Sequence, residues 1–117
     1  MLRGLLAALV VLAAPVSALA NPEQYNALGP GTMSCGNWST FRHGNASDWI
    51  PQADWVLGYI TAYNYFIWTR STNVVDGASA DVLMAWIDDY CTAHPLDSLA
   101  AATHALVVEF VRRQISK

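Results

Sequence analysis

The sequence predicts an all-α protein, a small bundle of about four helices stapled by one disulfide. Between positions 34 and 114, apolar residues recur at steps of three and four, the spacing of amphipathic helices, and no segment has the alternation of a strand. The only two cysteines, Cys35 and Cys91, fall in two different predicted helices of a chain that begins with an export signal. Two cysteines in an exported chain favour one disulfide.

The first twenty residues have the features of a signal peptide. Arg3 supplies a positive charge before the apolar run Leu5 to Ala14, and Ala18-Leu19-Ala20 fits a small-residue cleavage site. The apolar run is shorter than the roughly 20 residues that a membrane span needs, so an uncleaved anchor is the weaker alternative. We therefore expect a cleaved signal peptide over residues 1–20, a flexible leader over 21–32 and a single helical domain over 33–117.

Composition and charge exclude some classes of function. Removing Arg3 from the six basic residues leaves five against nine acidic ones, so the mature net charge is −4, and no basic run is present. Nucleic-acid binding normally needs a clustered basic surface, so no nucleic-acid partner is expected. Signal cleavage would leave an exported, periplasmic chain without a membrane span.

The first two helices are predicted from apolar spacing. A short helix is expected to begin near Ser34, which places Cys35 and Trp38 on one side. The second is expected to hold Pro51 in its first turn, where the missing N–H has no cost, and to end near Thr69. Its apolar side recurs every fourth residue and is expected to be mostly core. That side contains Trp55, Tyr59, Tyr63 and Ile67, and it is widened by Val56, Ile60 and Phe66.

The third helix is predicted to be capped by Ser79 or Asp76 and to stop before Pro95, because the residue before proline avoids the helical conformation. The fourth is predicted to be capped by Asp97 and to run to about Gln114. Its inner face is expected to contain Leu99, Ala102, Leu106 and Phe110.

The segment Asp88 to Ser98, DDYCTAHPLDS, has the composition of a metal or catalytic site. Cys91 could act as a zinc ligand or as a nucleophile only as a free thiolate, and zinc needs three or four converging ligands. In this exported chain Cys91 is better explained as half of a disulfide with Cys35, and His94 as the end of a helix. Asp88 and Asp89 are then solvated carboxylates, and no catalytic residue, metal or cofactor is expected.

Aromatic residues are the best candidates for binding another protein. Nine of the thirteen aromatic residues lie between Trp38 and Trp68, and a domain this small cannot bury all of them. The predicted partner-binding residues are Trp55, Tyr59, Tyr63 and Trp68.

One resemblance follows from the cysteine placement. The chain carries MSCGNW at residues 33–38, then a central hydrophobic helix, then WIDDYC at 86–91 and an amphipathic last helix. This pattern resembles the HdeA/HdeB-like family of small periplasmic helical proteins over about residues 33–115. The resemblance implies that Cys35 and Cys91 match the family's bridge. It also implies an acid-stress chaperone, a dimer that loosens at low pH and exposes apolar surface to unfolding client proteins.

A second resemblance leads to another function. The segments WVLGYITAYNYF and WIDDYCTAHPLDSLAAATHALV look like those of Tai/Rap-type immunity proteins of type VI secretion. Gly58-Tyr59 and His94-Pro95 are the matching positions. This resemblance implies a periplasmic inhibitor that blocks the active site of a peptidoglycan amidase. Both resemblances favour a non-enzymatic protein that acts by binding other proteins.

Overall fold

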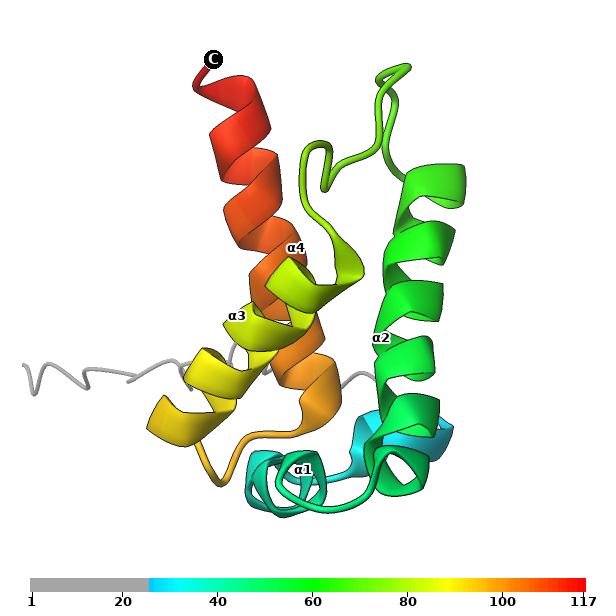
Figure 1. Cartoon of the computed structure of the whole chain (residues 1–117). Helices are drawn as coiled ribbons and strands as arrows, with labels where there is room; N and C mark the ends of the chain where they lie inside the picture. The colour runs from blue at the N-terminus through cyan, green and yellow to red at the C-terminus, as the bar shows by residue number, and fades with distance from the viewer. Residues whose placement is uncertain (1–25) are drawn as a thin grey trace, which may run out of the picture.

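The computed structural model describes residues 26–117, which form four α-helices preceded by one 3-10 turn (Figure 1). The predicted signal peptide and residues 21–25 of the predicted leader lie outside this range. The elements are η1 (Gly29–Thr32), α1 (Cys35–Arg42), α2 (Ala46–Phe66), α3 (Ala80–Ala93) and α4 (Leu99–Ile115). The all-α prediction is confirmed, and between residues 26 and 117 no strand is found beyond an isolated bridge of Ser34 with Ser98.

The two long helices α2 and α4 form the sides of the molecule, and α1 lies across their lower end (Figure 1). α1 packs against α3 and α2, while α4 packs against α3 and α2. The connector between α2 and α3 also enters the core, where Val74 and Val75 are buried. Its backbone is held from both sides, because Asn64 accepts a hydrogen bond from the Val74 N–H and Gln114 donates one to the Val74 carbonyl.

The disulfide prediction is confirmed, since Cys35 on α1 is bonded to Cys91 on α3. Both cysteines are buried, and fully buried Trp38 and Ile87 lie among the core residues beside them. The inner face of α4 is also as predicted: Leu99, Ala102, Leu106 and Phe110 are all buried.

Two helix starts differ from the prediction. α2 begins at Ala46 rather than at Pro51, because Asp48 accepts the Asn45 N–H at 3.3 Å and so supports an earlier first turn. Pro51 therefore lies inside the helix. α4 is capped by Ser98, whose hydroxyl accepts the Ala101 N–H at 3.0 Å. Asp97 does not cap it, because its carboxylate is bound by the Tyr90 hydroxyl.

Two further boundaries differ. α2 ends at Phe66 instead of near Thr69, because the N–H groups of Ile67 and Trp68 both bond to the Tyr63 carbonyl and close the last turn. Residues 29–32, expected in the leader, form η1, in which Gly31 is buried. η1 packs against α2 and α4.

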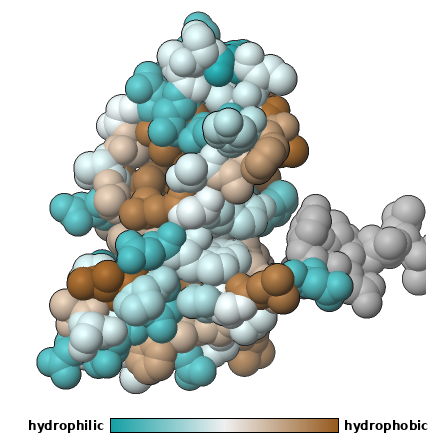
Figure 2. All heavy atoms as spheres, turned by 90° about the vertical axis from the view of Figure 1, so that its right-hand side faces the viewer, coloured by the Kyte–Doolittle hydropathy of each residue, from teal (hydrophilic) through white to brown (hydrophobic). Residues whose placement is uncertain are grey.

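The aromatic side of α2 was expected to be mostly core, and this is only partly correct. The buried positions of α2 are Ala53, Val56 and Ile60, and two of these, Val56 and Ile60, belong to the predicted apolar side. Trp55, Tyr59 and Tyr63 are half-buried, and Ile67 is 61% exposed. Viewed from the α2 side, hydrophobic atoms reach the surface in separate areas between hydrophilic ones (Figure 2). Within residues 26–117 no helix has the length and apolar character needed to cross a membrane.

Candidate functional site

A groove of about 780 Å³ lies between residues 26–28, α2 and the junction of α3 with α4. Its volume lies in the ~300–1,000 Å³ range typical of ligand sites. Trp55 and Tyr59 of α2 and Tyr90 of α3 supply aromatic walls, and small alanines of α4 leave the space between them. We call this the aromatic groove. Its lining is Asn26, Ala27, Leu28, Trp55, Tyr59, Tyr90, Leu96, Asp97, Ser98, Ala100, Ala101, His104 and Ala105.

Two leucines give the aromatic groove an exposed apolar rim. Leu28 is 79% exposed and Leu96 is 95% exposed, the highest value among the large exposed apolar residues. Leu96 lies in the short α3–α4 connection, between Pro95 and Asp97. An exposed apolar side chain is unremarkable alone, but both of these leucines line the same groove and add exposed apolar surface to it.

Hydrogen bonds orient the aromatic rings that line the groove. The Tyr90 hydroxyl donates to Asp97 Oδ2 at 2.7 Å, and the Tyr59 hydroxyl lies 3.3 Å from His104 Nδ1. The Trp86 ring stacks on Tyr90 with centroids 5.6 Å apart. A buried tyrosine or tryptophan usually satisfies its polar atom in this way while its ring offers apolar area. The groove is therefore shaped before any ligand binds.

The position of Trp55 depends on Gly31. A Cβ atom built on Gly31 would overlap the six-membered ring of Trp55, so only a residue without a side chain fits beneath the indole. The Trp55 and Tyr59 rings also contact each other, with centroids 5.8 Å apart. η1 thus sets the depth at which these two rings enter the groove.

The four predicted partner-binding residues divide into two pairs. Trp55 and Tyr59 line the aromatic groove, whereas Tyr63 and Trp68 do not. Trp68 folds onto the loop after α2, where its indole N–H donates to the Thr72 carbonyl at 2.8 Å. The sequence interpretation missed Tyr90, Leu28 and Leu96. An apolar residue inside the polar turn His94–Ser98 was the one available signal for Leu96.

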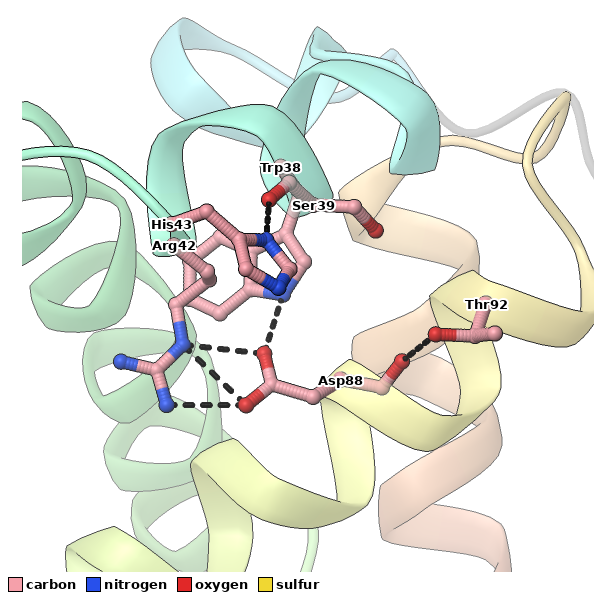
Figure 3. Close-up of polar contacts among 6 residues, drawn as sticks. All are labelled: Trp38, Ser39, Arg42, His43, Asp88 and Thr92. Carbon is pink, nitrogen blue, oxygen red and sulfur yellow. Dashed lines mark hydrogen bonds and ion pairs between the residues drawn. The ribbon is translucent and has the colours of Figure 1, made fainter.

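A second group of polar residues surrounds Asp88 (Figure 3). Asp88 precedes Cys91 of the disulfide by three residues. The prediction that Asp88 is a solvated carboxylate is wrong. Its Oδ1 accepts from the Trp38 indole N–H at 2.9 Å, and the Arg42 guanidinium binds both carboxylate oxygens at 2.8–3.2 Å. The Arg42 guanidinium also lies over the Trp49 ring, 4.4 Å from its centroid.

This arrangement makes Asp88 a clamp between α1 and α3. Hydrogen bonding to Asp88 raises the pKa of Arg42, which favours the charged form of the guanidinium. A hollow of about 290 Å³ next to it is lined by Ser39, Arg42, His43, Asp88 and Thr92. Because both Asp88 oxygens already accept hydrogen bonds from protein donors, the carboxylate is engaged in holding the two helices together.

Two other residues of the Asp88–Ser98 segment, His94 and Ser98, lie at the ends of helices. His94 follows the last residue of α3, as predicted, and its N–H bonds to the Tyr90 carbonyl. Within the part of the chain that the structure describes, no group of three or more His, Cys, Asp or Glu side chains is placed to hold a metal ion.

Comparisons with models of protein families, with curated proteins and with solved structures found no match to this chain. The functional interpretation therefore depends on the residues and on the geometry of the aromatic groove.

Proposed function

We propose that this protein is a non-enzymatic binding protein of the periplasm that holds an apolar segment of another polypeptide in the aromatic groove. An HdeA-like stress chaperone for unfolding clients is the leading form of this function. The observation that carries the proposal is the aromatic groove itself, with its three aromatic walls and its exposed leucine rim.

The chemistry of the groove suits a polypeptide ligand. Tyrosine and tryptophan supply large, rigid contact area and are enriched at protein interfaces. Leu28 and Leu96 expose apolar side chains to solvent. A client that covers them removes this apolar surface from water, which favours binding. The disulfide Cys35–Cys91 ties α1 to α3 and would limit how far the bundle opens under acid stress.

A specific inhibitor of one secreted enzyme, as in the immunity proteins, is the second candidate. The pairs Tyr90–Asp97 and Tyr59–His104 favour it, because fixed polar groups in a preformed groove select one orientation of one partner. An unfolded client would need no such fixed polar groups.

The experiment is a client-protection assay from pH 7 to pH 2, with an apolar dye reporting exposed surface in parallel. We expect wild-type protein to suppress client aggregation and the double variant Leu28→Ser/Leu96→Ser to lose most of that effect. The matched control is Val82→Ser/Val108→Ser, which removes side chains that are 54% and 52% exposed outside the groove.

The outcomes separate the two candidates. Loss of protection in both double variants would show that the groove is not the binding surface. No protection by wild-type protein at any pH would contradict the chaperone. A periplasmic pull-down that yields one peptidoglycan hydrolase, retained only when Leu28 and Leu96 are intact, would support the inhibitor instead.

A further inference from the structure

The charges of the described chain are divided between its two ends. Residues 65–78 and 109–117 carry four basic side chains against two acidic ones, Asp76 and Glu109. The remaining described residues carry one arginine, Arg42, against six aspartates. The net side-chain charge is thus +2 for residues 65–78 and 109–117 together and −5 for the remaining described residues. We call the first group the basic end; its cations are Arg70, Arg112, Arg113 and Lys117.

The fold, not the sequence order, gathers this basic end. Arg70 belongs to the loop after α2, yet its guanidinium donates to the Gln114 carbonyl near the end of α4 at 2.9 Å. Figure 1 shows the C-terminus of α4 and the loop that follows α2 at the same, upper end of the molecule. Glu109 is held by Arg112 and Arg113 at 2.8–3.0 Å, so the acidic side chain nearest to them on α4 is already paired.

The same end exposes apolar side chains. Tyr65, Phe66 and Ile67 are consecutive and are 83%, 78% and 61% exposed, and the Tyr65 and Phe66 rings contact each other edge to face. We call these three residues the apolar tip. Ile115, in the last turn of α4, is 63% exposed. In Figure 2 hydrophobic atoms reach the surface in the upper half of the molecule beside strongly hydrophilic ones.

Exposed aromatic and aliphatic residues next to basic side chains are typical of proteins that lie on a lipid surface. Aromatic rings prefer the region of the lipid headgroups, and basic side chains are attracted by anionic lipids. The acidic remainder of this chain would be repelled by the same surface, which fixes the orientation. A purely apolar partner would not account for the charge division, and an anionic surface accounts for both features.

We propose that the basic end and the apolar tip dock this protein on an anionic lipid surface, without any segment crossing it. Docking in this orientation leaves the aromatic groove accessible, because the groove lies at the N-terminal half of α4 and the basic end at its C-terminal half. Ala101 and Arg112 are eleven residues apart, which is about 16 Å along a helix. The proposal does not depend on the function proposed for the groove.

The test is co-sedimentation of the purified protein with vesicles of phosphatidylglycerol and phosphatidylcholine in equal parts, compared with vesicles of phosphatidylcholine alone. We expect at least tenfold stronger binding to the anionic vesicles, weakened by 0.5 M salt because the Debye length falls to roughly 4 Å. Phe66→Ser/Ile67→Ser and Arg112→Gln/Lys117→Gln should each reduce that binding at least fivefold. Residues 1–25 are the same in every variant, so differences between variants report only on the basic end and the apolar tip.

The matched control is Leu28→Ser/Leu96→Ser, which removes an equal number of exposed apolar side chains at the groove. It should keep full vesicle binding, and circular dichroism should show unchanged helix content in all variants. Equal binding to both vesicle types, no binding, or unchanged binding of the Phe66→Ser/Ile67→Ser variant would each overturn the proposal. A dimer of the wild-type protein in sedimentation that becomes a monomer only in the Arg112→Gln/Lys117→Gln variant would also overturn it, because the basic end would then bind a second copy.

Discussion

The indole N–H of Trp38 donates a hydrogen bond to the carboxylate of Asp88 across 2.9 Å, one helical turn from the disulfide on both helices. Trp38 follows Cys35 by three residues, and Asp88 precedes Cys91 by three, so the two links show that α1 and α3 run antiparallel. Trp38 is completely buried. Asp88 is therefore the partner that allows a tryptophan N–H to lie in the core.

Replacing Asp88 by alanine should lower the free energy of unfolding by about 2 kcal/mol. The substitution leaves the Trp38 N–H without an acceptor and removes the carboxylate that Arg42 binds. Urea denaturation at pH 7, followed by tryptophan fluorescence and circular dichroism, measures this loss. Asp88→Asn should cost less, because an amide oxygen still accepts from Trp38.

Asp89→Ala is the matched control, since Asp89 is the neighbouring acidic residue and is exposed. Its effect should stay within about 0.5 kcal/mol, as for most surface substitutions. Equal losses for the Asp88 and Asp89 variants would contradict the clamp.

Most of the helices and the disulfide could be predicted because their signals are local. Apolar spacing placed α1 and α3 within a residue or two, and two cysteines in a chain with a predicted signal peptide predicted the bridge. Helix starts were harder wherever two capping residues stand side by side. Asp97 and Ser98 are both good caps, and the choice depends on Tyr90, which reaches back from α3 to bind Asp97.

Only two of the three aromatic walls of the groove could be predicted from the sequence. Trp55 and Tyr59 were found because they lie on one helix at a regular spacing. Tyr90 comes from another helix, and Leu96 from a turn, so their convergence depends on how α3 and α4 pack. Asp88 was misjudged for the same reason: its two partners lie about fifty residues away on α1.

Removal of the disulfide should destabilise the protein by roughly 4 kcal/mol in the chain-entropy account, since it closes a loop with a sequence separation of 56. The Cys35→Ser/Cys91→Ser variant, compared with wild type by urea denaturation, measures this change. A reduced wild-type sample should match the variant. A loss below about 1 kcal/mol would show that the Asp88 clamp and the core hold α1 to α3 without the bond.

Glu109 should contribute to stability in a defined range of pH. Hydrogen bonds from Arg112 and then Arg113 lower the pKa of its carboxyl from 4.5 to about 2. A folded-state pKa below the unfolded value stabilises the fold above the unfolded pKa. This contribution is thus complete above about pH 4.5 and is lost as the pH falls toward about 2.

The Glu109→Gln variant should therefore have a lower Tm than wild type at pH 6, and the two values should converge near pH 2. Thermal melts at intervals between pH 6 and pH 2 measure the difference. Glu109 is solvent-exposed in its ion pairs, so high salt should reduce the difference at pH 6. A constant offset in Tm at every pH would contradict the assignment to these ion pairs.

Gly31→Ala should deform the aromatic groove and destabilise the fold by about 1–3 kcal/mol, the range for overpacking. The new methyl group would occupy space that the Trp55 ring fills, so either the indole or η1 must move. Urea denaturation measures the free energy of unfolding, and the client-protection assay measures binding in the groove.

Gly58→Ala is the matched control, because a Cβ at Gly58 meets nothing within 4 Å and the residue lies inside α2. Replacing a helical glycine there should stabilise the protein by about 0.5–1 kcal/mol and leave client binding unchanged. If Gly31→Ala and Gly58→Ala shifted the free energy of unfolding in the same direction, the Trp55 ring would not be packed against Gly31.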